Sequence, residues 1–279
     1  MIWQCPLCAK PLTLGKEAWH CSNRHSFDRA REGYVNLLPV YRKRRKEPGD
    51  SADMLRARRR FLKAGYYRPL VEAIAALLPH KPGRKLLDIG CGEGYYLREL
   101  ESAGWHGHGL AGVDISKSGV RMAAKSDSAA QFVVASNVNL PVASNSVDNL
   151  LRIFAPAPDG EMLRVLKKGG QLLDVAPGPD HLWTLKGQLY KEPRKHPAPK
   201  LVEGLYPEVD MRCCFPFELR GHEAIADFLA MTPFAWKGCR EARAELEQQD
   251  SLVLEADFIV RRFIKRTLVG EGTAAVWRK

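Results

Sequence analysis

The sequence predicts an α/β protein with a mostly parallel seven-stranded sheet and a small N-terminal metal-binding ribbon. Two observations lead to this fold class. From residue 67 onward, short apolar segments alternate with helical segments, which is the pattern of parallel strands covered by helices on both faces. Before residue 36 the chain is rich in turns and carries three cysteines, so a bound metal has to replace the core that so few residues cannot form.

Length and composition are those of a globular protein. The chain has 279 residues, of which 45% are hydrophobic and 27% charged, enough for one large domain with a small appendage. No apolar run approaches the roughly 18 residues of a membrane span. The first residues, MIWQCPLC, lack the basic and apolar regions of a secretion signal, so we expect a cytoplasmic protein. Seven cysteines, an odd number, argue against a disulfide framework.

The net charge of +11 is concentrated in one part of the chain. Residues 1–70 contain 16 Lys and Arg against 6 Asp and Glu, whereas the rest of the chain is nearly neutral. A localised basic field is typical of proteins that bind a polyanion, most simply nucleic acid. A solubilising surface is the alternative, but the field coincides with the metal-binding segment, which favours nucleic acid.

We expect three parts: a zinc-binding module at 1–35, a basic linker and helix at 36–66, and a main domain at 67–279. The run RKRRK at 42–46, followed by Pro48 and Gly49, is typical of a flexible linker. Ser51 is expected to cap the next helix, and Gly65 to end it. The few apolar residues of that helix predict shallow burial.

The strands of the main domain follow in order. They are predicted in KLLDIG, GLAGVDIS, QFVVAS, SVDNLLRIF and QLLDVAP, and later in VDMRCCFPFELR and DFIVRRFIKR. A helix with one apolar face precedes the first strand. Further helices are expected in GEGYYLRELESAG, near 117–125, in EMLRVLKKGG up to its glycine pair, and near 222–230 and 240–248.

The clearest functional motif is LDIGCGEGYY, which joins a strand to a helix. Asp88 ends the strand, and Gly90, Gly92 and Gly94 follow at intervals of two. Glycine is needed where the backbone turns tightly and approaches a ligand closely. Dinucleotide-binding loops space their glycines by two and then three and bind pyrophosphate. This acidic loop therefore favours a ligand with a cationic amine and sulfonium and no phosphate, with a nicotinamide-binding domain as the alternative.

Two further segments follow later strands at the same edge of the sheet, where ligands of such sheets bind. Asp114 ends the second strand, and an acid there can accept hydrogen bonds from both hydroxyls of an adenosine ribose. Asn137 and Leu140, after the third strand, are expected to flank an adenine.

The N-terminal stretch CPLCAKPLTLGKEAWHCSNRH contains two short ligand pairs, Cys5-x2-Cys8 and Cys21-x3-His25. Each pair has the spacing that lets a turn chelate one ion, so we expect tetrahedral Zn²⁺ in a closed, structural site. His20 is a poorer ligand, because its one-residue offset from Cys21 cannot form the same chelate. The spacing differs from that of two-histidine fingers, which favours a ribbon that grips folded RNA.

Taken together, the LDIGCGEGYY loop, GVDIS, the LP segment with Asp148, and the VLKKGG turn resemble a class I S-adenosylmethionine-dependent methyltransferase. The resemblance implies a Rossmann-like fold and S-adenosylmethionine as the cofactor.

With the N-terminal module added, the chain is similar to the bacterial 23S rRNA (guanine-N1)-methyltransferase family. The matching stretches are CPLC…CSNRH-x-FD, EGYVNLLP, PGDSADM-x-x-AR-x-x-FL, LDIGCGEGYY, PGPDHL and MTPFAW. The resemblance implies methyl transfer to N1 of a guanine in a 23S rRNA hairpin, by a homodimer. It implies zinc at Cys5, Cys8, Cys21 and His25, and cofactor contacts from Tyr67, Gly92, Glu93 and His181.

Several alternatives remain open on the sequence. Tyr67 could be ordinary core, and His181 could cap the helix that follows it. The whole chain could be an RNA-binding protein with an inactive cofactor domain, or a small-molecule methyltransferase. Phe154 is a candidate to stack on the target guanine. The catalytic base is unknown, because Asp159 and Asp180 are more typical of turn or cap residues.

Overall fold

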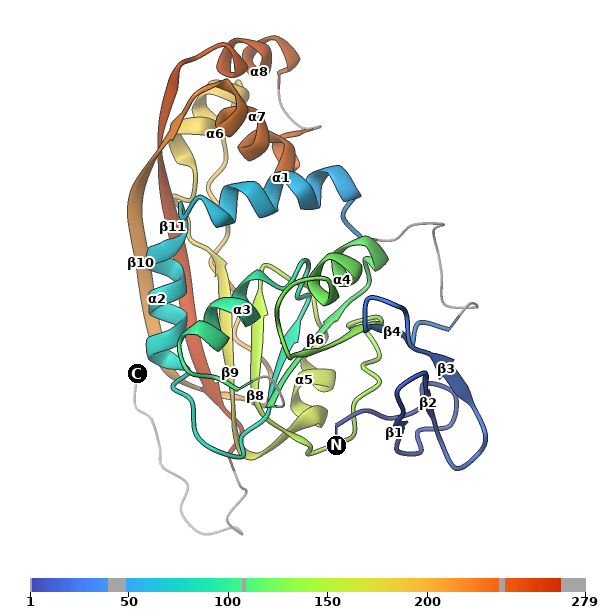
Figure 1. The fold of residues 1–279 in the computed structure, drawn as a ribbon. Coiled ribbons are helices and arrows are strands. Elements are labelled where there is room, and N and C mark those ends of the chain that lie inside the picture. Colours follow the sequence, from blue (N-terminus) through green and yellow to red (C-terminus); the bar gives the residue numbers. More distant parts are fainter. Residues whose placement is uncertain (1, 40–48, 107–108, 236–238, 267–279) are drawn as a thin grey trace, which may run out of the picture.

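The computed structural model describes residues 2–39, 49–106, 109–235 and 239–266 (Figure 1). The predicted basic linker run at 42–46 and Trp236 of the MTPFAW stretch lie outside these ranges. None of the helices in the described ranges is long and apolar enough to span a membrane.

An eight-stranded sheet forms the centre of the molecule, in the order β10-β11-β9-β8-β5-β6-β7-β4. The five pairs from β9 to β4 are parallel, and β10 and β11 are antiparallel additions at one edge. This arrangement confirms the predicted α/β class. The strands are β4 (Val35–Asn36), β5 (Leu86–Ile89), β6 (Leu110–Asp114), β7 (Gln131–Val134), β8 (Val147–Ile153), β9 (Leu166–Pro177), β10 (Tyr206–Arg220) and β11 (Ser251–Ile264).

The sheet has one strand more than the seven predicted. The extra strand, β4, lies in EGYVNLLP and pairs in parallel with β7, with Val35 opposite Val133. An exposed strand edge presents unpaired backbone groups that another segment can satisfy, and the fully buried Val35 anchors this addition. The segment reads as a connection in sequence because it is only two residues long.

Helices cover both faces of the sheet. They are α1 (Ala52–Lys63), α2 (Arg68–Leu77), α3 (Tyr95–Ser102), α4 (Lys117–Ala124), α5 (Asp159–Val165), α6 (Trp183–Leu189), α7 (His222–Met231) and α8 (Arg240–Glu247). α5 ends at Val165, so the prediction that this helix runs to the glycine pair is wrong. Residues 166–170 instead begin β9, where Lys265 and Gly170 share a backbone hydrogen bond.

The N-terminal module forms a three-stranded sheet of β1 (Thr13–Leu14), β2 (Ala18–His20) and β3 (Ser26–Asp28). Its buried side chains Trp3, Leu12 and Trp19 belong to the same hydrophobic cluster as Leu87 and Ile89 of β5. The module therefore covers the sheet face that α5 also covers, while α2, α3 and α4 pack on the opposite face. Backbone bonds from Gln4 N–H to the Pro141 carbonyl, and from Ala143 N–H to the Ile2 carbonyl, join the module to the main domain.

The helix α1 lies across the carboxyl edge of the sheet, beside α7 (Figure 1). Its start is as predicted, because the Ser51 side chain accepts a hydrogen bond from Met54 N–H. The prediction of shallow burial is wrong, since Leu55, Phe61 and Leu62 are all buried. The helix is buried against α7 and the long β10–β11 pair, which extends past the other strands. The local sequence of α1 does not reveal these partners.

The arginines of α1 contribute to this packing. Each forms an ion pair with a nearby acid, and the pairs of Arg59 and Arg60 reach acids outside α1 and hold the helix in place. The pairs are Arg56 with Asp53, Arg58 with Asp50, Arg59 with Glu93, and Arg60 with Asp227.

Candidate cofactor pocket and metal centre

A cavity of about 950 Å³ lies at the carboxyl ends of the parallel strands, beneath α1. It is near the upper end of the roughly 300–1,000 Å³ that a ligand site usually occupies. Eight of the nine residues predicted to bind a cofactor line it, namely Tyr67, Asp88, Gly90, Gly92, Glu93, Asp114, Asn137 and His181.

The ninth residue, Gly94, has a packing role. It is the N-cap of α3 with a φ of 79°, a conformation that favours glycine. A Cβ atom there would lie 2.9 Å from the Cβ of Ala123 on α4. The third glycine of the loop therefore allows α3 and α4 to approach each other.

The first glycine of the loop shapes the cavity wall. Gly90 has a φ of 80°, and a Cβ atom there would lie 2.4 Å from the Cβ of Ala155. The N–H groups of Gly90 and Cys91 both donate to the carbonyl of Val113, which ties the loop to β6. Only glycine permits this tight turn and the close approach to Ala155.

Two carboxyl groups make the floor of the cavity acidic. Asp114 accepts hydrogen bonds from the N–H groups of Gly92 (2.9 Å) and Ser116 (2.7 Å). Burial raises the pKa of Asp114. Burial, followed by the neighbouring Asp114, raises the pKa of Asp88 to about 8. Both carboxyls would therefore be stabilised in their charged form by a cationic ligand.

Asn137 presents an unsatisfied acceptor. Its Nδ2 donates to the carbonyl of Pro156 (3.2 Å), but its buried Oδ1 has no partner within the described residues. Buried polar atoms are nearly always hydrogen-bonded, so this oxygen indicates a ligand donor. An exocyclic amine on an adenine would satisfy it. The acidic floor and this acceptor together fit S-adenosylmethionine, which is cationic and carries adenosine.

The carboxylate of Glu93 faces two arginines. It accepts from Arg59 Nε (2.6 Å) and Arg98 Nη2 (2.9 Å), and only 1% of its side chain is exposed. The carboxylate thus joins α1, the glycine loop and α3. Sequence reasoning missed this role, because Arg59 lies 34 positions away.

Tyr67 and His181 also line the cavity. The Tyr67 ring packs edge-on against Phe61 and Phe258, so it is core as well as cavity wall. His181 Nδ1 accepts a hydrogen bond from Asp257 N–H (3.2 Å). The alternative that His181 caps a helix is wrong, because the N-cap of α6 is Leu182 and has no side-chain cap. Burial is the main cause that lowers the pKa of His181 to about 3.

Several cavity residues were not predicted. Met231 and Phe234 line the cavity, as do Lys186 on α6 and His196 in the segment 190–200. The one sequence signal for this wall was the MTPFAW stretch, which carries Met231 and Phe234.

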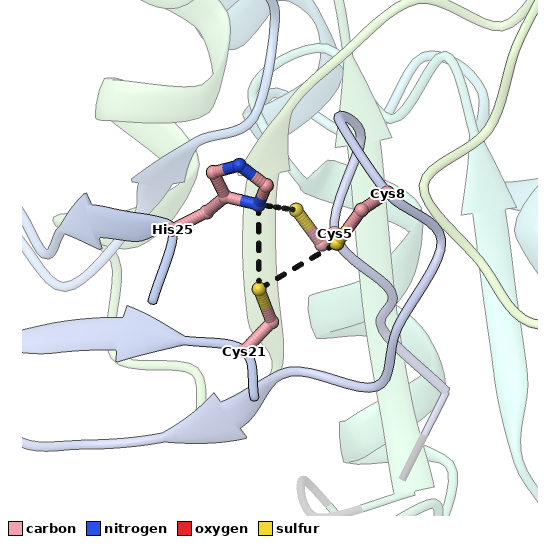
Figure 2. A group of neighbouring side chains, drawn as sticks. All are labelled: Cys5, Cys8, Cys21 and His25. Atoms are coloured by element: carbon pink, nitrogen blue, oxygen red, sulfur yellow. Dashed lines mark hydrogen bonds between the residues drawn. The ribbon is translucent and has the colours of Figure 1, made fainter. Parts of the chain in front are cut away.

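The four predicted zinc ligands meet at one point of the N-terminal module (Figure 2). Their ligand atoms all lie within 4.8 Å of one another. His25 Nδ1 is 3.4 Å from Cys5 Sγ and 3.5 Å from Cys21 Sγ, and Cys8 Sγ is 3.6 Å from Cys21 Sγ. Zinc bonds of about 2.3 Å to sulfur and 2.0–2.1 Å to nitrogen place tetrahedral ligands about 3.6–3.8 Å apart. The residues therefore fit a closed zinc site.

Comparisons with known proteins match both parts of the chain. The family model described as "RlmA, N-terminal", a zinc ribbon, matches residues 3–46, and the "Methyltransferase domain" model matches residues 86–170. A 23S rRNA (guanine(748)-N(1))-methyltransferase of Streptomyces fradiae is 35% identical over 245 residues, covering 84% of this chain and 85% of that protein.

Two further relatives differ in how much of this chain they match. YxjB of Bacillus subtilis strain 168, whose name provisionally places it in the same enzyme class, is 32% identical over 274 residues, or 92% of this chain and 94% of that protein. The 24-methylenesterol C-methyltransferase 2 of Oryza sativa subsp. japonica is 32% identical over only 138 residues, or 42% of this chain and 38% of that protein. The relatives that match most of this chain thus carry the names of rRNA enzymes, whereas the sterol enzyme matches less than half of it.

Proposed function

This chain belongs to the 23S rRNA (guanine-N1)-methyltransferase family, and from that premise we propose that it methylates N1 of a guanine in a hairpin loop of 23S rRNA. One observation carries the proposal. The acidic cavity at the carboxyl edge of the sheet and the zinc-binding cluster occur in one chain, and a relative that this chain matches over 85% of its length is named as an rRNA enzyme. The enzyme uses S-adenosylmethionine and a structural zinc ion.

S-adenosylmethionine supplies an electrophilic methyl group on a positively charged sulfur. We assign the ribose hydroxyls to Asp114 and the adenine amine to Asn137 Oδ1, because these acceptors face the cavity. Gly90 and Gly92 permit the close approach of the ligand. Glu93 contributes through its backbone, since its carboxylate is held by two arginines. Tyr67 and His181 complete the cavity wall.

The target guanine enters the same cavity beside the cofactor. Extruding a base costs a few kcal/mol, and less in a loop where the base is unpaired. Phe154 is the aromatic group for stacking: its side chain is 46% exposed and lies at the carboxyl end of β8. Its φ of 54° is unusual for a residue other than glycine and turns the backbone at this point. Much of the rate comes from alignment of the reacting atoms in a site that excludes water.

The zinc module provides the surface for RNA. Its exposed basic residues are Lys10, Lys16, Arg24, Arg29 and Arg31. Contacts to phosphate make binding depend steeply on salt, which distinguishes an RNA enzyme from a small-molecule methyltransferase. We further propose that two copies associate to hold the hairpin, and that the enzyme acts in the cytoplasm, where its substrate is made.

We also propose the division into a zinc-binding module (1–35), a connecting segment with α1 (36–66) and a methyltransferase domain (67–279). It is supported by the two family models, which match separate parts of the chain.

The test is methyl transfer from labelled cofactor to unmodified 23S rRNA, followed by primer extension. Methylation at N1 blocks Watson–Crick pairing, so reverse transcriptase should stop one nucleotide before a single guanine. Asp114→Ala enzyme should give no stop. Label in RNA without a stop would show that another atom is methylated, and label only in small molecules would refute the RNA substrate.

A further inference from the structure

Methyl transfer to N1 of guanine requires a proton acceptor. At neutral pH this nitrogen carries a hydrogen atom, and its lone pair becomes available for bonding only as that proton leaves. General-base catalysis of such a step is typically worth about 10²–10⁴-fold in rate. Neither of the loop acids considered from sequence can serve. Asp180 is ion-paired with Lys195 and Arg212, and Asp159 accepts from Glu203 N–H outside the cavity.

The cavity has two chemically different ends. The glycine loop, Asp114 and Asn137 form the cofactor end. Phe154 directly precedes Ala155, which packs against Gly90, and from this exposed ring a chain of rings leads away to Phe258 (5.4 Å between centroids), then to His181 (4.7 Å) and His196 (6.0 Å). A base stacked on Phe154 therefore lies on the side of the cavity that carries the two histidines.

Most acceptors along the cavity are already engaged. Asp114 binds two backbone N–H groups, and Asp50 is ion-paired with Arg58 beneath α1. Asp88 lies in β5 next to the glycine loop, where the cationic cofactor would engage its charge. His181 uses its Nδ1 lone pair to accept from Asp257 N–H, so its proton is on Nε2 and it can only donate into the cavity.

His196 differs from all of these. It lines the cavity, it is partly buried, and neither of its ring nitrogens has a hydrogen-bond partner among the described residues. Its backbone N–H donates to the Pro179 carbonyl, which holds the residue beside the loop that carries His181. A neutral imidazole in the cavity lining has a free lone pair that can accept a proton.

Burial and the neighbouring Lys186 favour the neutral form of this imidazole. The lysine is only 7% exposed, and its one hydrogen bond within the described residues is a 3.3 Å contact to the Arg194 carbonyl. Burial first, and then the positive charge of Lys186, lower the pKa of His196 below its usual value. The charged groups around His196 are Lys186 of α6, Asp257 of β11, which acts in the opposite direction, and Glu192, Arg194 and Lys195 of its own segment.

We propose that His196 is the general base that accepts the N1 proton of the target guanine, with Lys186 as the residue that poises it, an assignment that rests on the proposed function. The N1–H bond breaks and its proton passes to the free ring nitrogen of His196. The N1 electron pair forms the new bond to the methyl carbon, and the pair of the carbon–sulfur bond remains on sulfur and cancels its charge. The imidazolium then releases the proton to water.

The test compares His196→Gln with His222→Gln, an exposed histidine at the start of α7 that lies outside the cavity wall. Single-turnover methylation of a 23S rRNA hairpin should slow about 100-fold in His196→Gln and less than twofold in His222→Gln. Affinity for S-adenosylmethionine, measured by calorimetry, should stay within twofold in both variants. Added imidazole should raise the methylation rate of His196→Ala at least tenfold. A purely structural role of His196 would not permit this rescue.

Two pH measurements sharpen the test. Because the base acts only when neutral, the wild-type rate should rise with pH through the pKa of His196 and then level off, and this break should vanish in His196→Gln. NMR of imidazole-labelled protein without substrate should show His196 titrating below pH 6.5, and at higher pH in Lys186→Met, where the nearby positive charge is absent.

The rival base is Glu192, which also lines the cavity but is exposed. If Glu192→Gln abolishes the pH break while His196→Gln keeps it, the assignment is wrong. A loss below threefold in His196→Gln would also overturn it. Wild-type enzyme that places no methyl group on N1 would instead refute the proposed function, so the two failures are distinct.

Discussion

Replacing Glu93 with alanine should destabilise the whole protein, because its carboxylate joins three elements around the cavity. The side chain is 1% exposed, whereas its partners Arg59 and Arg98 are 26% and 18% exposed. Removing one partner of a buried ion pair costs about 3–5 kcal/mol. Water can partly solvate the two guanidinium groups left behind, so we expect about 3 kcal/mol, at the lower end of that range.

For a chain of this size, about 3 kcal/mol corresponds to a melting temperature lower by about 6–12 °C. Urea unfolding followed by tryptophan fluorescence measures the free energy directly. Glu93→Gln should lose about half as much, because its amide oxygen can still accept one of the bonds.

The matched control is Glu99→Ala on α3, the helix that follows the glycine loop. Glu99 pairs with Arg68, whose side chain is 62% exposed, and such surface pairs contribute about 0–1 kcal/mol. Equal losses in Glu93→Ala and Glu99→Ala would refute the idea that the buried carboxylate holds α1 and α3 to the glycine loop.

Three further outcomes are expected. Since burial raises the pKa of Asp88 to about 8, binding of the cationic cofactor should release a proton, and cofactor affinity should increase from pH 6 to pH 8. Calorimetry in buffers of different ionisation enthalpy measures the proton release. Asp88→Asn should remove the dependence of affinity on pH. Asp114→Ala should weaken cofactor binding at least about tenfold, since it loses the ribose acceptor and the bond that holds Gly92 N–H; unchanged affinity would contradict the ribose assignment. Cys21→Ser should lower the zinc content measured by atomic absorption. It should also lower the melting temperature of the whole chain, because the module shares a hydrophobic cluster with the sheet. Substitution of the exposed Cys239 by serine should change neither quantity.

Features encoded by neighbouring residues were predictable. The zinc ligands lie in two short pairs, so their convergence needed only two turns and a hairpin. The Ser51 cap, the glycine loop and the succession of strands and helices along the chain also follow from local spacing and apolar periodicity. These patterns led to the fold class, the cofactor and the metal without knowledge of any distant contact.

Other features depend on contacts between distant segments, and only the tertiary structure decided them. Arg60 and Asp227, which join α1 to α7, are 167 positions apart, and no periodicity marks them as partners. The same is true of Arg59 with Glu93, of the two-residue strand β4 at the edge of β7, and of His196 beside His181 in the cavity. A sequence pattern specifies which face of an element is buried, but it does not specify which other element covers that face. The closure of the cavity by α1, and the group that can accept a proton inside it, therefore emerged only from the folded chain.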